Sequence, residues 1–195
     1  MRRIGLFGGT FDPPHVGHLA LAEWAREQLG LDQVLFVPAG TPPHKRGRRH
    51  SSAAARVAMT RLAVRGNAAF RLSTLEVRRR GPSFTVDTLR ALRARAPGAR
   101  LYLLMGEDSL VEFSGWREPA AIAALASLAV ARRPGRGRRG SAGRPPRVTW
   151  LDNPGLELSS SAIRARVRRG RSIRYLVPDA VAAYVRRHGL YRRNA

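Results

Sequence analysis

Residues 8–18 read Gly-Gly-Thr-Phe-Asp-Pro-Pro-His-Val-Gly-His, and they join a short apolar strand, residues 4–7, to a helix that begins near His15 or Val16. The two glycines permit a close backbone approach that a side chain would block, and the two prolines delay the helix. The first amides of that helix should face outward, unpaired within the helix, and carry the positive end of its dipole, which favours an anion. With the imidazoles of His15 and His18 at the same helix start, the stretch predicts a phosphate site.

Two histidines could instead be structural, or they could bind a metal ion. A His-x-x-His pair supplies only two ligands, the chain has no cysteine, and no nearby cluster of Asp, Glu or His completes a zinc site. We therefore predict that no metal is held by protein histidines, and that the two imidazoles donate to phosphate oxygens.

Length and composition indicate one well-packed domain over residues 1–195, with 44% hydrophobic residues. The apolar stretch at 120–131 is too short to span a bilayer, and the N-terminus lacks the apolar core of a signal peptide. A chain without cysteine has no thiol to oxidise to a disulfide, which fits a cytoplasmic protein. We expect a cytoplasmic protein with no membrane partner.

The formal net charge of +23 is almost entirely arginine, because Lys45 is the only lysine. This bias looks like a tilt toward GC-rich codons. The arginines cluster at 132–147 and 164–193, where they would attract any polyanion at low salt. The first cluster has no interleaved aromatic residues and no groove-reading motif is visible, so we expect no specific nucleic acid as a partner.

Strand and helix patterns alternate along the chain. Strands are expected at 2–7, 33–38, 71–77, 100–105, 128–131 and 148–151, and helices at 16–29, 51–64, 85–96, 109–113, 119–125, 162–169 and 179–188. This rhythm predicts an α/β fold: a Rossmann-like, doubly wound, mostly parallel sheet with helices on both faces and a small C-terminal helical part at about 160–195. Residues 134–146, rich in Arg, Gly and Pro, indicate a flexible surface loop.

Ligands of such a sheet bind at the carboxyl ends of its strands. Three motifs follow strands and so belong to one rim: the His15 and His18 stretch, Pro42-Pro43-His44-Lys45, and Gly106-Glu107-Asp108-Ser109. A second constellation, Ser159-Ser160-Ser161 with Arg164, stands directly before a helix. One of its serines would serve as the helix cap, and hydroxyls, amides and a guanidinium could converge there on one phosphate chain.

Together these motifs resemble the nucleotidylyltransferase superfamily, with GTFDPPHVGH as its HxGH signature and SSSAIR where the superfamily has an ISSTxIR-type sequence. Over nearly its full length the chain is similar to the bacterial nicotinate-nucleotide adenylyltransferases. The similar stretches are GGTFDPPHVGH, FVPAGTPPHK, GPSFTVDTL, YLLMGEDSL, GW, ARRPG, SSSAIR and YLVPDAVAAYVRRHGLY. Those between the two phosphate motifs separate this branch from phosphopantetheine adenylyltransferases and glycerol-phosphate cytidylyltransferases.

The resemblance implies an enzyme of NAD biosynthesis that transfers the adenylyl group of ATP to nicotinate mononucleotide. The products would be deamido-NAD and pyrophosphate, formed by direct in-line attack without a covalent enzyme intermediate. Mg²⁺ would be held mainly through the ATP phosphates. Catalytic roles are implied for His15, His18 and Arg164. Contacts with ATP are implied for Gly8, Gly9, Thr10, Phe11, His15, His18, Gly106, Asp108, Arg133, Ser160, Ser161 and Arg164.

For the second substrate, the resemblance implies Lys45, Thr85 and Trp116. Trp116 would stack on the pyridine ring, and backbone amides around Thr85 would donate to its carboxylate. Core packing of Trp116 and helix capping by Thr85 are the structural alternatives. Another phosphorylated acceptor, such as nicotinamide mononucleotide, stays open, as do a basic nucleic-acid-binding protein and homo-oligomerisation.

Overall fold

The structure is a computed structural model, and it describes residues 1–41, 50–132, 148–153 and 155–192. Within these residues six strands form one sheet in the order β3-β2-β1-β4-β5-β6, and every pairing is parallel. The strands are β1 (Arg3–Gly9), β2 (Gln33–Pro38), β3 (Phe70–Leu72), β4 (Arg100–Gly106), β5 (Ser127–Ala131) and β6 (Val148–Leu151). The chain order reverses between β1 and β4, and this switch point is where α/β sheets bind ligands.

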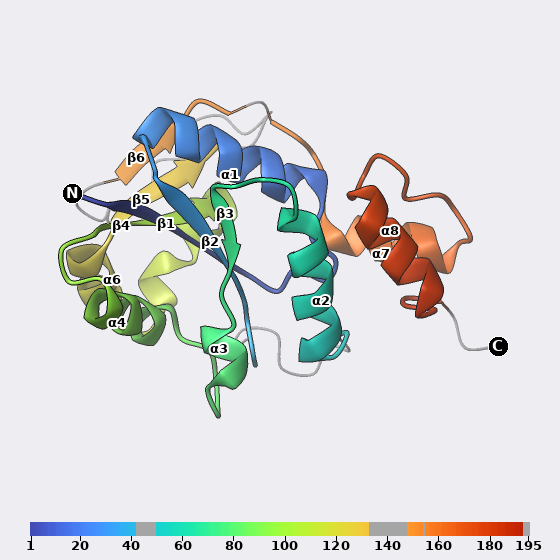
Figure 1. Ribbon diagram of the computed structural model, residues 1–195, viewed down its shortest axis with the longest axis horizontal. Helices are drawn as coiled ribbons and strands as arrows, with labels where there is room; N and C mark the ends of the chain where they lie inside the picture. Colours follow the sequence, from blue (N-terminus) through green and yellow to red (C-terminus); the bar gives the residue numbers. More distant parts are fainter. Residues whose placement is uncertain (42–49, 133–147, 154, 193–195) are drawn as a thin grey trace.

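Helices lie on both faces of the sheet (Figure 1), as the sequence predicts. They are α1 (Val16–Leu29), α2 (Ala53–Val64), α3 (Leu75–Arg78), α4 (Thr85–Arg95), α5 (Glu107–Val111), α6 (Pro119–Leu125), α7 (Ser160–Arg168) and α8 (Asp179–Arg187), with a 3₁₀ turn at Phe113–Gly115. Of the described residues, none belongs to a helix long and apolar enough to cross a membrane.

Alternation along β4 divides the core between the two faces of the sheet. Leu101 and Leu103 pack into a cluster with the apolar faces of α4 and α6, whereas Tyr102 and Leu104 pack into a cluster with α1. Near-continuous apolar strands are what a parallel sheet covered on both faces requires. A third cluster joins α2 to α7 and α8, so the C-terminal helices are attached to the sheet through α2.

The strand expected at 71–77 is wrong in its second half. Pairing with β2 stops at Leu72, and Leu75–Arg78 form the short helix α3 instead. The neighbouring strand β2 ends at Pro38, which has no N–H to extend the ladder. The amide of Arg78 then donates to the carbonyl of Thr74 at 3.0 Å, which closes a helical turn. The helix expected at 109–113 also begins earlier, at Glu107, directly after β4.

Candidate active site

A cavity of about 540 Å³ opens at the carboxyl ends of β1, β2, β4 and β5, where the sequence predicts the ligand rim. Most of the predicted site residues line it: Gly8, Gly9, Thr10, Phe11, His15, His18, Thr85, Gly106, Trp116, Ser160, Ser161 and Arg164. Asp108 is not among the lining residues, although Ser109 and Glu112 of the same turn are. Lys45 and Arg133 lie outside the described residues.

The two imidazoles of the HxGH motif stack on each other at the start of α1. Their ring centroids are 3.6 Å apart and their planes differ by 28°. His15 is the N-cap residue, and its backbone N–H donates to Nδ1 of His18 at 3.1 Å. Because that nitrogen accepts a hydrogen bond, the ring of His18 carries its proton on Nε2.

Burial lowers the pKa of His15 to about 4, so this ring is neutral at pH 7. Stacking at 3.6 Å also opposes two positive charges on the pair, because like charges at this distance disfavour ionisation of both groups. Phe11 packs edge-on against His18, with ring centroids 5.1 Å apart. The stacked rings therefore offer N–H donors, and the ring of His15 does so without a charge.

One part of the sequence prediction for this helix start is wrong. The first amide of α1, that of Val16, is not turned toward a ligand, because it donates to the carbonyl of Leu176 at 3.0 Å. The amide of His15 is likewise used by His18. An anion at this site therefore depends on imidazole donors more than on these two backbone amides.

The second motif begins α7 and lies directly against the first. Ser159 is the helix cap, its Oγ accepting from the amide of Ala162 at 3.1 Å. Ser160 Oγ donates to the carbonyl of Pro13 at 2.9 Å. A hydroxyl has one proton to donate, so Ser160 can offer a phosphate only its backbone amide while this bond persists.

Arg164 reaches across to the turn before His15. Its guanidinium donates to the carbonyl of Asp12 at 2.7 Å and to Oγ of Ser161 at 3.1 Å. A guanidinium has five N–H donors, so others stay available for an anion. The structure thus brings together the two motifs that are about 145 residues apart in the sequence.

Asp12 is the buried centre of this region, with 1% of its surface exposed. Its carboxylate accepts from the hydroxyl of Tyr191 at 2.6 Å and from the amide of Ser51 at 3.2 Å, and it lies 3.3 Å from Nδ1 of His50. Burial alone would raise the pKa of Asp12, but these hydrogen bonds, with the charge of Arg164, hold the pKa below its usual value. Asp12 is therefore ionised, and its lone pairs are engaged by the protein.

Arg56 fastens the ends of two strands to α2. Its guanidinium donates to the carbonyls of Thr10, Ala39 and Gly40, and its Nε donates to the carbonyl of Ser51 at 3.2 Å. Only 2% of its surface is exposed. No sequence pattern indicates the role of this residue, because an arginine on a helix in so basic a chain is not distinguished from the others.

An aromatic side chain stands at the other end of the cavity. Trp116 lines it and packs against Phe113, with ring centroids 5.6 Å apart. Its Nε1 is buried and has no hydrogen-bond partner among the described residues. Thr85, the first residue of α4, also lines the cavity, and the cap of that helix is Phe84 rather than Thr85.

Close backbone packing shapes the same wall. The amide of Gly40 donates to Oγ of Ser83 at 2.9 Å, and a Cβ at Gly40 would stand 2.4 Å from the carbonyl oxygen of Glu76. Burial raises the pKa of Glu76, although the hydroxyl of Thr88 donates to its carboxylate at 2.8 Å and opposes the rise. Only glycine fits at position 40 without displacing α3.

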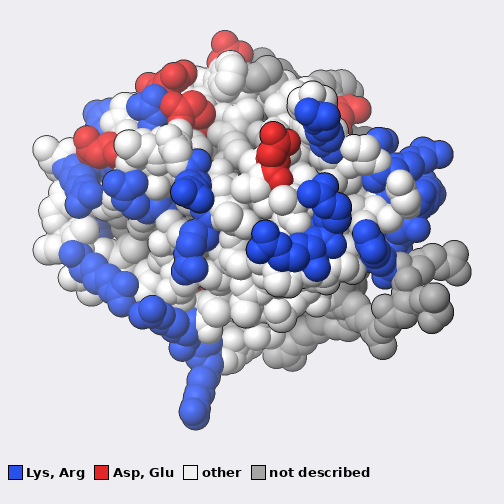
Figure 2. Space-filling view, turned by 45° about the vertical axis from the view of Figure 1, so that its right-hand side comes forward, with Lys and Arg blue, Asp and Glu red and all other residues white. Residues whose placement is uncertain are grey.

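Sequence reasoning also missed Arg132 and Asn153, which line the cavity after β5 and β6. The amide of Arg132 donates to Oδ1 of Asn153 at 2.9 Å. The expectation that ligands bind at the carboxyl ends of the strands could have indicated both residues, as it did the other motifs, since each follows a predicted strand. Arginines are spread over the face shown in Figure 2, and a positive field of this kind favours the approach of polyanions.

The fold, the stacked HxGH pair and the adjoining SSSAIR motif define a nucleotidyltransferase. The sequence pattern of the family described as cytidylyltransferase-like matches residues 6–166, and the chain belongs to this family. Within it the chain is a member of the nicotinate-nucleotide adenylyltransferases, a group of enzymes of NAD biosynthesis.

Two curated relatives and one solved structure illustrate the similarity. A probable nicotinate-nucleotide adenylyltransferase of Thermomicrobium roseum is 50% identical, over 98% of this chain and 92% of the relative. One of Salinibacter ruber is 46% identical, over 97% of each chain. The fold matches that of the Plasmodium falciparum nicotinic acid mononucleotide adenylyltransferase complexed with NaAD, at a TM-score of 0.81, 16% identity and 98% coverage of both chains.

Proposed function

We propose that this chain transfers the adenylyl group of ATP to nicotinate mononucleotide, releasing pyrophosphate and forming deamido-NAD. The observation that carries the proposal is the junction of the two motifs, where stacked His15 and His18 face the start of α7 and Arg164 across one cavity. The nearly full-length similarity to the curated relatives supports the same acceptor.

In the proposed reaction an oxygen of the mononucleotide phosphate attacks the α-phosphorus of ATP. The bond from that phosphorus to the oxygen bridging to the β-phosphate breaks, and its electrons leave with pyrophosphate. The protein forms no bond itself, so its contribution is positioning and stabilisation of charge. Nε2–H of His18 and the ring of His15 donate to the transferring phosphate, while Arg164 and the Ser160 and Ser161 segment hold the departing phosphates.

Magnesium enters this proposal as part of the ATP complex. Imidazoles, hydroxyls and a guanidinium dominate the phosphate end of the cavity, and these groups pair with phosphate oxygens. In the part of the chain that the structure describes, no three His, Cys, Asp or Glu side chains form a metal-binding group. Mg²⁺ would accordingly be bound by ATP oxygens and water.

The proposed acceptor occupies the opposite end of the cavity. Its pyridine ring stacks on Trp116, and the backbone N–H groups at the start of α4, around Thr85, donate to the nicotinate carboxylate. The substrate contacts of Lys45, Asp108 and Arg133 stay predictions from the sequence. A cytoplasmic location, a single domain over residues 1–195 and the oligomeric state also stay predictions.

The test is pyrophosphate release with ATP and Mg²⁺, offering nicotinate mononucleotide, nicotinamide mononucleotide and phosphopantetheine separately. Turnover with the first acceptor and little with the others supports the proposal, whereas turnover only with another acceptor refutes it. His18→Ala should lower kcat at least about a hundredfold. His188→Ala, at an exposed histidine beyond α8, is the matched control and should leave kcat unchanged. A His18→Ala enzyme with normal kcat would exclude the assigned role.

A further inference from the structure

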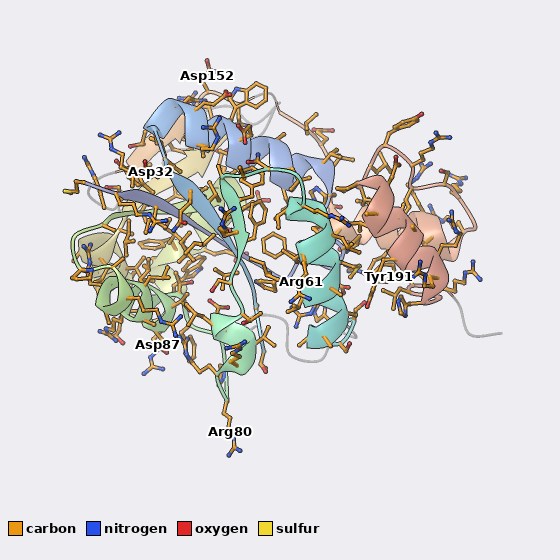
Figure 3. All side chains as sticks on the ribbon, in the orientation of Figure 1. Asp32, Arg61, Arg80, Asp87, Asp152 and Tyr191 are labelled. Carbon is orange, nitrogen blue, oxygen red and sulfur yellow. The ribbon has the colours of Figure 1, made fainter. Side chains whose placement is uncertain are left out.

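Tyr191 lies beyond the family match, which stops at residue 166, and its side chain stands between α2 and α8 (Figure 3), where it bonds to Asp12, a residue that lines the active-site cavity. Its hydroxyl donates to Oδ1 of Asp12 at 2.6 Å and lies 3.7 Å from Sδ of Met59. Burial, followed by the hydrogen bond to Asp12, raises the pKa of Tyr191, so the phenol keeps its proton throughout the physiological range.

The residue that Tyr191 contacts is a fixed point for both phosphate motifs. The backbone carbonyl of Asp12 accepts from Arg164 at 2.7 Å, and the carbonyl of the next residue, Pro13, accepts from Ser160 at 2.9 Å. Two residues further on is His15, the first of the stacked pair. A shift of the Asp12 side chain would therefore move Arg164 and His15 together.

The C-terminal part supports the same turn at a second place, where the carbonyl of Leu176 accepts from the amide of Val16. The buried apolar residues of α8 attach this part to α2 and α7, which fixes where Tyr191 stands. Figure 1 shows α7 and α8 side by side at the end of the molecule beyond α2.

We propose that Tyr191 is a positioning residue of the enzyme: by holding the Asp12 carboxylate, it sets the placement of His15 and Arg164 against the phosphates of ATP. This inference rests on the proposed function. The C-terminal helical part is on this view a component of the active site and does more than add to the stability of the fold. Tyr191 itself does not line the cavity and acts through Asp12.

The test compares Tyr191→Phe with Tyr184→Phe. Both variants remove a single hydroxyl, but Tyr184, on α8, packs against the ring of His188 and makes no side-chain hydrogen bond in the described part of the chain. We expect Tyr191→Phe to fold and to lose kcat by about tenfold to a hundredfold at saturating substrates, because small displacements of reacting groups have effects of this size. Tyr184→Phe should stay within about twofold of the wild type.

A double-mutant cycle separates positioning from a general loss of stability. If Tyr191 acts through Asp12, then Asp12→Asn and Tyr191→Phe lower kcat by less together than the product of their separate effects. Wild-type kcat in folded Tyr191→Phe overturns the proposal, and so does an activity loss that merely follows the fraction of unfolded protein.

A nitrogen-15 NMR spectrum of the five histidine side chains provides a readout that does not depend on catalysis. The signals of His15 and His18, assigned with single-histidine variants, should move in Tyr191→Phe and stay in place in Tyr184→Phe. If the wild type releases no pyrophosphate with any of the acceptors offered, the proposed function fails. This spectrum still decides whether Tyr191 sets the geometry of the turn. Unchanged signals would then overturn the inference.

Discussion

His15 should make the stability of the fold depend on pH in a way that a single substitution removes. The ring is 6% exposed, and burial lowers its pKa from the ordinary 6.5 to about 4. In the unfolded chain the same imidazole regains its ordinary pKa. Between these two pH values the unfolded state binds more protons than the folded state, so stability falls as the pH is lowered from 6.5 to 4 and levels off below that.

The size of the effect follows from the two pKa values. Their difference, at 1.36 kcal/mol per pH unit, amounts to about 3 kcal/mol in the free energy of unfolding, of which about 2 kcal/mol is lost by pH 5. Such a loss is a large fraction of the stability of an ordinary domain. The contribution of His15 is complete above pH 6.5, where both states hold a neutral ring.

The assay is urea unfolding of the wild type and His15→Asn at several pH values between 7 and 4.5. Asparagine is a favourable N-cap residue, so α1 keeps its start while the titrating group is removed. The wild type should lose about 2 kcal/mol more than the variant between pH 7 and pH 5. Both chains share every other carboxylate and histidine, so their common acid sensitivity cancels. Stability curves that run parallel over this range would refute the reasoning.

Three further changes test other parts of the site. Arg56→Met should lower the free energy of unfolding by about 3 kcal/mol, since four partly buried carbonyls lose their donor, whereas the exposed Arg61→Met on the same helix (Figure 3) should change it by less than about 0.5 kcal/mol. Gly40→Ala places a Cβ 2.4 Å from a carbonyl oxygen of α3 and should lower the thermal midpoint by several degrees; Gly98→Ala, where a Cβ meets nothing within 4 Å, is its control. Trp116→Ala should raise KM for the mononucleotide about fivefold to tenfold in steady-state kinetics, while an unchanged KM would exclude stacking.

Periodicity alone located most of the elements, because strands buried on both faces and helices buried on one leave different apolar spacings. It failed at 71–77, where the end of the neighbouring strand at Pro38, and not the local pattern, decides that the chain turns into a helix. The HxGH stretch was correctly expected at the carboxyl end of its strand for a similar reason, since that expectation depends only on strand direction.

The sequence by itself determined the class of fold, the two phosphate motifs and the family, because each is written in a contiguous run of residue types. Only the tertiary structure decided how the HxGH stretch is arranged. The rings stack, burial keeps His15 neutral, and the first amide of α1 donates to the carbonyl of Leu176. It also decided that Asp12, Arg56 and Tyr191 support the turn. Hydrogen bonds between residues up to 179 positions apart are set by packing, which no local pattern encodes.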